Sequence, residues 1–273
     1  MQANSKPFFS IITSTLNAAG TIGRCIQSVA VQTFEGREHI VVDGASTDGT
    51  AELLHSRRDQ FSVLISEPDT GIYSAWNKAL LNARGEWIFF LGGDDVLADA
   101  EVLADVAEFI GKNGLQGGIV YGDVLLVKEE SYTELEHRRV DPRRICRQSF
   151  FDIVPGIPPH PSVFHHRSLF SQFGRFDEKF RIAADTKFIL NALCIHKSPW
   201  THIPRTVNRV TARGISTTGG MNVVREQLAV LKDLSLRCSF AAKVRYAAKP
   251  FLRSILKKML GERNTRRLID FFR

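Results

Sequence analysis

The stretch that decides the fold is WIFFLGGDDVL, residues 87–97, where a run of bulky apolar side chains passes through two glycines into two aspartates. The apolar run predicts a buried strand. Asp94 and Asp95 then stand side by side where the chain turns outward. Adjacent carboxylates repel each other and raise each other's pKa unless a positive group relieves them. We therefore expect a positive group between or beside these two side chains.

The chain around this stretch alternates between strand and helix patterns. Predicted strands cover residues 8–17, 38–44, 61–67, 85–93 and 117–127, and predicted helices cover 19–32, 46–58, 71–83 and 99–114. Such alternation predicts an α/β fold with a mainly parallel sheet flanked by helices on both faces. Ligands of these sheets bind beyond the carboxyl ends of the strands.

The second half of the chain is less regular. Beyond about residue 128 we predict an irregular proline-rich loop at 152–162, a helix at 183–196, an extended segment at 200–211, a polar glycine-rich loop at 213–220 and a helix from about residue 221. With 273 residues and 44% hydrophobic content, the chain suits one large domain, 1–236, and an appended tail, 237–273.

Composition limits the class of protein. No stretch approaches the ~18 apolar residues of a membrane span, and the first residues lack a signal-peptide pattern. Four scattered cysteines without a CxxC pair indicate reduced thiols in a cytoplasmic protein rather than zinc ligands or disulfides.

The net charge of +7 is concentrated in the tail, which holds eleven Lys or Arg against two acidic residues and leaves the body at −2. This distribution does not favour nucleic-acid binding by the body.

Polar side chains follow four of the predicted strands. They are Thr15 and Asn17 after the first strand, Asp43 after the second, Glu67 and Asp69 after the third, and Asp94 and Asp95 after the fourth. One aspartate of this kind is often a helix cap, which is how we interpret Asp48. Carboxylates from three strands at one sheet edge instead suit Mg²⁺ or Mn²⁺ shared with a diphosphate. Gly92 and Gly93 would let backbone and phosphate approach closely.

Five segments together resemble a known family. They are residues 10–34, 40–50, 67–80 and 85–95, with HPSVFHHRSLFSQFGRFDEKFRIAADTKFIL at 160–190. In this order they resemble glycosyltransferase family 2, over roughly residues 8–218, and particularly bacterial members that build O-antigen, capsule or exopolysaccharide. The resemblance implies the GT-A fold, a Rossmann-like sheet in one α/β domain. Its nucleotide-sugar half would cover about 8–127, and its acceptor half 128–218.

The resemblance also implies roles for individual residues. It places Thr15 and Asn17 at the base and ribose, Asp43 on uracil, Asp69 and Asn77 in the stretch that closes over the nucleotide, Asp94 at ribose or metal, Asp95 on the metal, and Asp185 as the catalytic base. Many relatives have a glutamate before this base, where this chain has Ala184. The implied reaction is an inverting, metal-dependent transfer from a UDP-sugar to a polyprenyl-diphosphate-linked saccharide, forming a β-linkage. Such a transfer needs one base and no covalent intermediate.

Several side chains allow two interpretations. His160 lies between prolines and would contact the donor phosphates, the metal or the acceptor, or else only fix its own loop. Arg213, in RGIST at 213–217, either pairs with phosphate or belongs to a solvated loop. Tyr73 and Trp76 are expected to pack in the core, and a second interpretation places one of them at a sugar pocket.

The tail has the pattern of a basic amphipathic helix, with Pro250 expected to break it in two. Such a helix can lie in the headgroup layer of an anionic membrane. We therefore expect a cytoplasmic protein peripheral on the inner face of the cytoplasmic membrane. The alternatives are a helix packed on its own domain and a helix that binds a partner.

Two other functions compete with the transferase. A sugar-1-phosphate nucleotidyltransferase is expected to have a glycine-rich, arginine-containing loop directly after the first strand, and residues 13–24 lack that run of glycines. A non-enzymatic adaptor for membrane or nucleic acid has no reason to gather carboxylates at one sheet edge. The donor sugar and the acceptor hydroxyl depend on pocket shape, which residue spacing does not encode.

Overall fold

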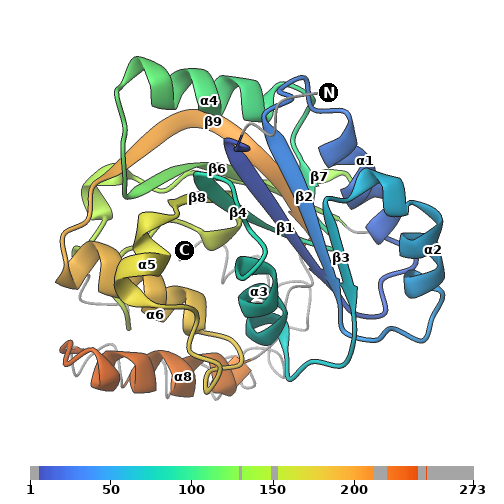
Figure 1. Cartoon of the computed structure of the whole chain (residues 1–273). Helices are drawn as coiled ribbons and strands as arrows, with labels where there is room; N and C mark the ends of the chain where they lie inside the picture. The colour runs from blue at the N-terminus through green and yellow to red at the C-terminus, as the bar shows by residue number, and fades with distance from the viewer. Residues whose placement is uncertain (1–5, 129–130, 149–152, 212–219, 239–243, 245–273) are drawn as a thin grey trace.

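The computed structural model describes residues 6–128, 131–148, 153–211, 220–238 and 244 (Figure 1). The predicted loop at 213–217, with Arg213, lies outside the described residues, and so does the predicted tail apart from residues 237, 238 and 244.

The strand–helix alternation predicted for the first half is confirmed. In chain order the elements are β1 (Phe9–Thr15), α1 (Ile22–Ala30), β2 (Arg37–Asp43), α2 (Thr50–Ser56), the 3-10 turn η1 (Arg58–Gln60), β3 (Val63–Ser66), α3 (Ile72–Leu80), β4 (Trp87–Gly92), β5 (Val96–Leu97), α4 (Val102–Lys112) and β6 (Ile119–Val127). The two-residue strand β5 and the 3-10 turn η1 are the described elements of this half that the pattern does not predict.

The second half adds strands that complete the same sheet. Its elements are β7 (Glu134–Arg138), η2 (Pro142–Arg144), η3 (His160–Ser162), β8 (Val163–His166), α5 (Ser168–Phe173), α6 (Ala184–Leu190), the π-helical turn η4 (Asn191–Ile195), β9 (Trp200–Thr211) and α8 (Gly220–Asp233). The helix predicted at 183–196 is therefore α6 continued by a π-helical turn. β7 escapes prediction because its residues are largely exposed and polar.

Among the described residues the sheet has nine strands, in the order β3-β2-β1-β4-β8-β6-β9-β5, with β7 paired to β6. β3, β2, β1 and β4 run parallel to one another, and β6 runs parallel to β9. β8 is antiparallel to both β4 and β6. The carboxyl ends of the first four strands therefore meet at one edge, as the sequence predicts.

Helices cover both faces of the sheet (Figure 1). The core on one face includes residues of α1, α2 and α4, and the core on the other includes residues of α3, α5, α6 and α8. The burial of β4 on both faces explains its composition. Trp87, Phe89 and Leu91 pack into the first core, and Ile88 and Phe90 pack into the second. A strand buried on both faces is apolar at most positions, which accounts for the run WIFFL.

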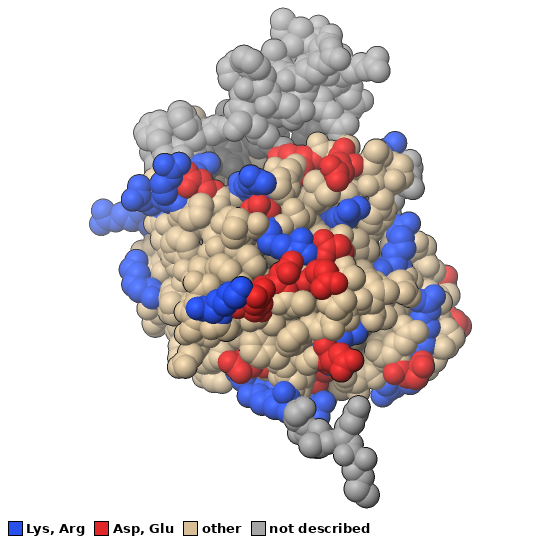
Figure 2. All heavy atoms as spheres, turned by 90° about the horizontal axis from the view of Figure 1, so that it is seen from above, with Lys and Arg blue, Asp and Glu red and all other residues tan. Residues whose placement is uncertain are grey.

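Charged side chains of both signs are interspersed on the face seen in Figure 2, where no continuous basic surface is visible over the described residues. Within that same part of the chain, no helix has the length and apolar character needed to cross a membrane.

Candidate functional site

A cleft of about 580 Å³ opens beyond the carboxyl ends of β1 and β4. Six of the predicted site residues line it, namely Thr15, Asn17, Asp94, Asp95, His160 and Asp185. The same walls include residues of β1, α3, the turn after β4, the segment before α6 and the end of β9. The fold thus brings both halves of the chain to one concave surface.

The turn after β4 depends on its two glycines. The Asp95 N–H donates to the Gly92 carbonyl over 3.0 Å. A Cβ on Gly92 would lie 2.9 Å from Asp95 Oδ2 and 3.0 Å from Asp94 Oδ1, and a Cβ on Gly93 would lie 2.9 Å from Thr15 Oγ1. Both carboxylates and a hydroxyl crowd the backbone here, so a side chain at either glycine would force them to shift.

The last residue of β9 fixes the two carboxylates. The Thr211 N–H donates to Asp95 Oδ1 over 3.2 Å, and the Thr211 hydroxyl donates to Asp94 Oδ2. Burial, and after it the Asp94 charge, raises the pKa of Asp95 to about 8. No ion pair between described residues includes either carboxylate. The repulsion predicted from the sequence is therefore present, and the side chains described around the pair do not neutralise it.

The donor set fits a cation shared with a ligand rather than one enclosed by protein. Among the residues that the structure describes, no group of three or more His, Cys, Asp or Glu could hold a metal. Mg²⁺ and similar hard cations commonly take one or two carboxylates and complete their coordination with phosphate oxygens and water. Asp94 and Asp95 at the cleft wall match this pattern.

Asp185 also lines the cleft, in the first turn of α6. Its Oδ1 accepts hydrogen bonds from the Tyr73 hydroxyl at 3.1 Å and from the Thr186 N–H at 2.6 Å. Its Oδ2 lies 4.0 Å from His160 Nδ1, and 22% of the side chain is exposed. Burial raises the pKa of Asp185 to about 6. Near neutral pH the carboxylate is therefore ionised and still basic enough to take a proton.

His160 is held by aromatic packing. Its ring stacks on Trp76 with centroids 4.9 Å apart and lies 5.6 Å from the ring of Phe90. Burial lowers the pKa of His160 to about 3, so the imidazole is neutral. Its Nε2 has no hydrogen-bond partner among the described residues. A neutral ring at the cleft can donate or accept a hydrogen bond but does not carry charge.

Asn17 and Asp43 shape the end of the cleft nearest β2. Asn17 takes a left-handed conformation (φ 50°), and its Oδ1 accepts from the Thr47 N–H over 2.9 Å. Asp43 is fully buried and accepts from the N–H and hydroxyl of Ser46 and from the Ser66 hydroxyl, the last at 2.7 Å. The Asp43 carboxylate thus braces the turn behind the cleft and does not line the cleft wall.

Asp69 and Asn77 also lie off the cleft wall. Asp69 accepts from the Gly71 N–H over 2.9 Å, and its Oδ2 would be 2.9 Å from a Cβ on Gly44, in the turn after Asp43. Asn77 donates to the Phe176 carbonyl over 2.9 Å and accepts from the Phe176 N–H. Carboxylates from three strands therefore do reach one edge of the sheet, but only Asp94 and Asp95 among them face the cleft.

Thr211 and Arg181 escaped the sequence analysis, which expected Tyr73 and Trp76 in the core with one of them at a sugar pocket. Tyr73 and Trp76 are buried as predicted, yet both line the cleft, and Trp76 Nε1 donates to Ser14 Oγ over 3.0 Å. Thr211 and the exposed Arg181 also line it. No sequence pattern links Tyr73 to a carboxylate so distant along the chain.

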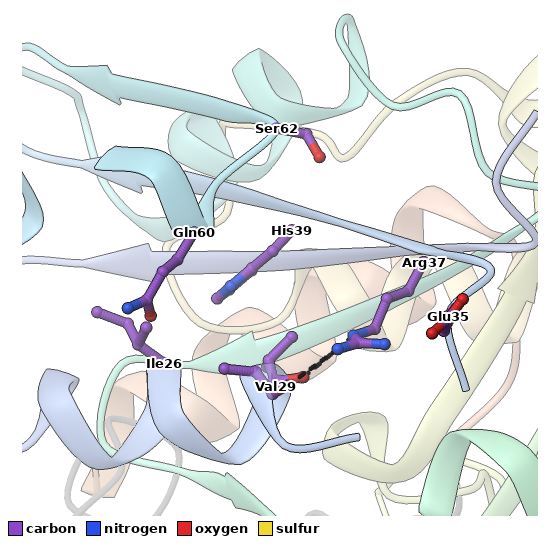
Figure 3. Close-up of a pocket in the computed structure, with 8 residues that line it drawn as sticks. Ile26, Val29, Glu35, Arg37, His39, Gln60 and Ser62 are labelled. Atoms are coloured by element: carbon purple, nitrogen blue, oxygen red, sulfur yellow. Dashed lines mark hydrogen bonds between the residues drawn. The ribbon is translucent and has the colours of Figure 1, made fainter. Parts of the chain in front are cut away.

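A second cavity, of about 320 Å³, lies at the opposite end of β2 (Figure 3). Its lining includes Arg37, the first residue of β2, and His39. The Arg37 guanidinium donates to the carbonyls of Val29, at 3.1 Å, and Ala30, at 3.0 Å, so it is used within the fold. None of the predicted site residues lines this cavity.

The curled mixed sheet and its helical layers are the architecture of a GT-A glycosyltransferase. The chain belongs to glycosyl transferase family 2, whose model matches residues 10–171. It is therefore a glycosyltransferase, as the sequence predicts.

A PGL/p-HBAD biosynthesis glycosyltransferase of Mycobacterium bovis is 34% identical over 189 residues, which cover 67% of this chain and 68% of the relative. Staphylococcus aureus TarS (residues 1–349), solved with UDP-GlcNAc, matches 76% of this chain and 59% of its own at 21% identity and a TM-score of 0.59. The mannosyltransferase PcManGT of Pyrobaculum calidifontis, solved with GDP-Man and Mn²⁺, matches 92% of this chain and 71% of its own at 19% identity and a TM-score of 0.61. At these identities the two structures support the fold.

Proposed function

We propose that this glycosyltransferase moves a sugar, with inversion, from a UDP-sugar to a lipid-linked saccharide during synthesis of a bacterial surface polysaccharide or glycolipid. The observation that carries the proposal is one cleft lined by the adjacent carboxylates of Asp94 and Asp95 and by the raised-pKa carboxylate of Asp185. A nucleotide-sugar transferase needs these two functions, one for the diphosphate and one for the acceptor, close together.

The donor would lie along the carboxyl ends of β1, β2 and β4. Thr15 and Asn17 line that part of the cleft and would contact base and ribose. Asp43 and Asp69 do not line the cleft wall, and they would contact uracil only at the rim of the cleft. The side chain of Asn77 is engaged with Phe176, so we leave it out of the proposed site.

Asp95, with Asp94, would hold Mg²⁺ or Mn²⁺ against the diphosphate. When bound, the cation would neutralise the charge that grows on the departing nucleoside diphosphate. The exposed Arg181 lines the cleft and could add positive charge there. Arg213 follows Thr211 by two residues in the sequence and stays a prediction for phosphate contact.

Asp185 would act as the general base. Its Oδ1 is occupied by the Tyr73 hydroxyl and the Thr186 N–H, which leaves Oδ2 to accept the proton of the attacking acceptor hydroxyl. The hydroxyl oxygen forms the new bond to the anomeric carbon as the bond to the diphosphate breaks on the opposite side. Neutral His160, near Oδ2, would orient the acceptor by a hydrogen bond.

Known relatives support the choice of donor and acceptor class. TarS was solved with UDP-GlcNAc, and the mycobacterial relative is named for PGL/p-HBAD biosynthesis. PcManGT was solved with GDP-Man, so a GDP-sugar is the donor alternative. A lipid-linked acceptor also agrees with the proposed role of the basic tail at the inner face of the cytoplasmic membrane.

A thermal-unfolding screen of nucleotide sugars, with and without Mn²⁺, tests the proposal. We expect UDP-sugars to raise the melting temperature only with Mn²⁺, since a ligand at 100 times its Kd adds ~2.7 kcal/mol of stability. The stabilising donor should then release UDP when a lipid-linked saccharide is added. Stabilisation by nucleoside triphosphates, with pyrophosphate released in the presence of a sugar 1-phosphate, would favour the nucleotidyltransferase instead.

A further inference from the structure

The segment that leads into the helix carrying Asp185 is bound by a residue of another helix. α6 begins at Ala184, and its N-cap, Ala183, has no side chain that can cap the helix. Glu226 of α8 instead binds the backbone just before the first turn. Its Oε1 accepts from the Arg181 N–H at 3.1 Å, and its Oε2 accepts from the N–H groups of Ile182 at 2.8 Å and Ala183 at 3.0 Å.

These three bonds fix the segment that leads into the proposed base. Backbone N–H bonds to a carboxylate are charge-assisted and stronger than neutral ones. Arg181 and Ile182 line the cleft, and Asp185 follows Ala183 by two residues. The Asp185 carboxylate is itself oriented by the Thr186 N–H, so its direction depends on the geometry of the first turn of α6.

We propose that Glu226 is a positioning residue for sugar transfer: by clamping three successive N–H groups, it holds the first turn of α6 so that Asp185 faces the cleft. This inference rests on the proposed role of Asp185 as the base. Glu226 does not line the cleft, so it would act only through the backbone that it holds.

α8 makes a second contact with this region, which offers a matched control. Asp233, at the carboxyl end of α8, pairs with Lys187 of α6 at 2.9 Å and also with Lys179. Both acidic residues therefore tie α8 to the neighbourhood of α6, but only Glu226 binds the backbone that precedes Asp185. Removing Asp233 weakens the docking of α8 without touching the clamp.

The test compares Glu226→Ala with Asp233→Asn in the full chain. For Glu226→Ala we expect kcat to fall about 10- to 100-fold, because small misplacements of a catalytic group have effects of this size. The KM for the donor and the Mn²⁺-dependent affinity for UDP should stay within about threefold of wild type. In the profile of kcat against pH, the midpoint of the fall on the acid side, the acid limb, should shift to lower pH. Burial is the main cause of the raised pKa of Asp185, and a loosened turn would admit water to its carboxylate.

Asp233→Asn should keep kcat within about threefold of wild type and leave the acid limb in place. Glu226→Gln should recover part of the loss, because its amide oxygen can still accept the bonds of Ile182 and Ala183. If Glu226→Ala fails to fold, judged by its circular dichroism and loss of UDP binding, Glu226→Gln decides the question. In that case, a partly reduced kcat together with an acid limb shifted slightly to lower pH supports the proposal.

Three results would overturn it. The first is a wild-type kcat in the Glu226 variants. The second is a reduced kcat in these variants with the acid limb of the pH profile in its wild-type place. The third is an Asp233→Asn variant that shows both the lower kcat and the shifted acid limb. Failure of the proposed function looks different, because Asp185→Asn would then retain wild-type activity. An inactive Asp185→Asn beside a fully active Glu226→Ala would reject the clamp alone.

Discussion

The pH dependence of kcat follows directly from the environment of Asp185. A base must be ionised to accept a proton, and burial raises the pKa of this carboxyl to about 6. Activity should therefore be present above this pKa and lost as the pH falls through it. By simple titration the ionised fraction drops from about 97% at pH 7.5 to about 9% at pH 5, so kcat should fall about tenfold over that interval.

The assay is the initial rate of UDP release at saturating donor and acceptor. Mn²⁺ must be titrated to a plateau at every pH, because the pKa of Asp95 is raised to about 8 and metal ligands must lose their proton to bind. Asp185→Asn should lower kcat by about 10²- to 10⁴-fold, equivalent to ~3–5 kcal/mol of barrier, and should remove the acid limb.

Two results would refute this reasoning. One is a wild-type kcat that stays flat between pH 7.5 and pH 5 at saturating Mn²⁺. The other is an Asp185→Asn variant that keeps the wild-type limb, which would assign the titration to another group.

Three further predictions follow from burial, hydrogen bonding and charge. Without metal, the contribution of Asp95 to the free energy of unfolding should fall as the pH rises from about 5 to 8, by up to a few kcal/mol, because the folded state keeps the proton of Asp95 and the unfolded chain does not; the difference in denaturant unfolding free energy between wild type and Asp95→Asn should change with pH by this amount. Asp43→Ala should cost roughly 2–4 kcal/mol of stability, since it leaves the hydroxyls of Ser46 and Ser66 without their buried acceptor; a loss under about 0.5 kcal/mol would contradict the bracing role. Deletion of residues 238–273 should move the protein from membrane to soluble fractions, and unchanged fractionation would reject the membrane tail.

Much of the fold was predictable because its signals are local. The run WIFFL is apolar because β4 is buried on both faces, and β1 and β2 are also largely buried. β5 and β7 were missed for the opposite reason: one has only two residues, and the other is largely exposed. Such strands form because neighbouring strands offer hydrogen bonds, which a single sequence window does not reveal.

The site was predictable only in part. The carboxylate pair is contiguous in sequence, so its repulsion and its glycines could be inferred from residues 92–95 alone. The partners of the site carboxylates come from distant elements: Thr211 of β9 binds the pair, Tyr73 of α3 binds Asp185, and Glu226 of α8 binds the backbone before Asp185. Their roles depend on tertiary contacts, and Asp185 itself entered only through a family resemblance.

The sequence predicted the place of Asp43 at the sheet edge but not the orientation of its side chain. Its position at the end of β2 is that of a ligand-binding residue, yet the carboxylate is fully buried in hydrogen bonds to Ser46 and Ser66. A strand-end position specifies the edge of the sheet but not the direction of the side chain, because the following turn decides that direction.

The central claim is that Asp94 and Asp95 hold a cation that binds the donor diphosphate. Calorimetric titration of UDP into the full chain, in Mn²⁺ and in a metal chelator, tests this most directly when wild type is compared with Asp95→Ala. We expect wild type to bind UDP at least tenfold more tightly with Mn²⁺, and Asp95→Ala to bind equally weakly in both. Equal UDP affinity of the two proteins in Mn²⁺ would contradict the account.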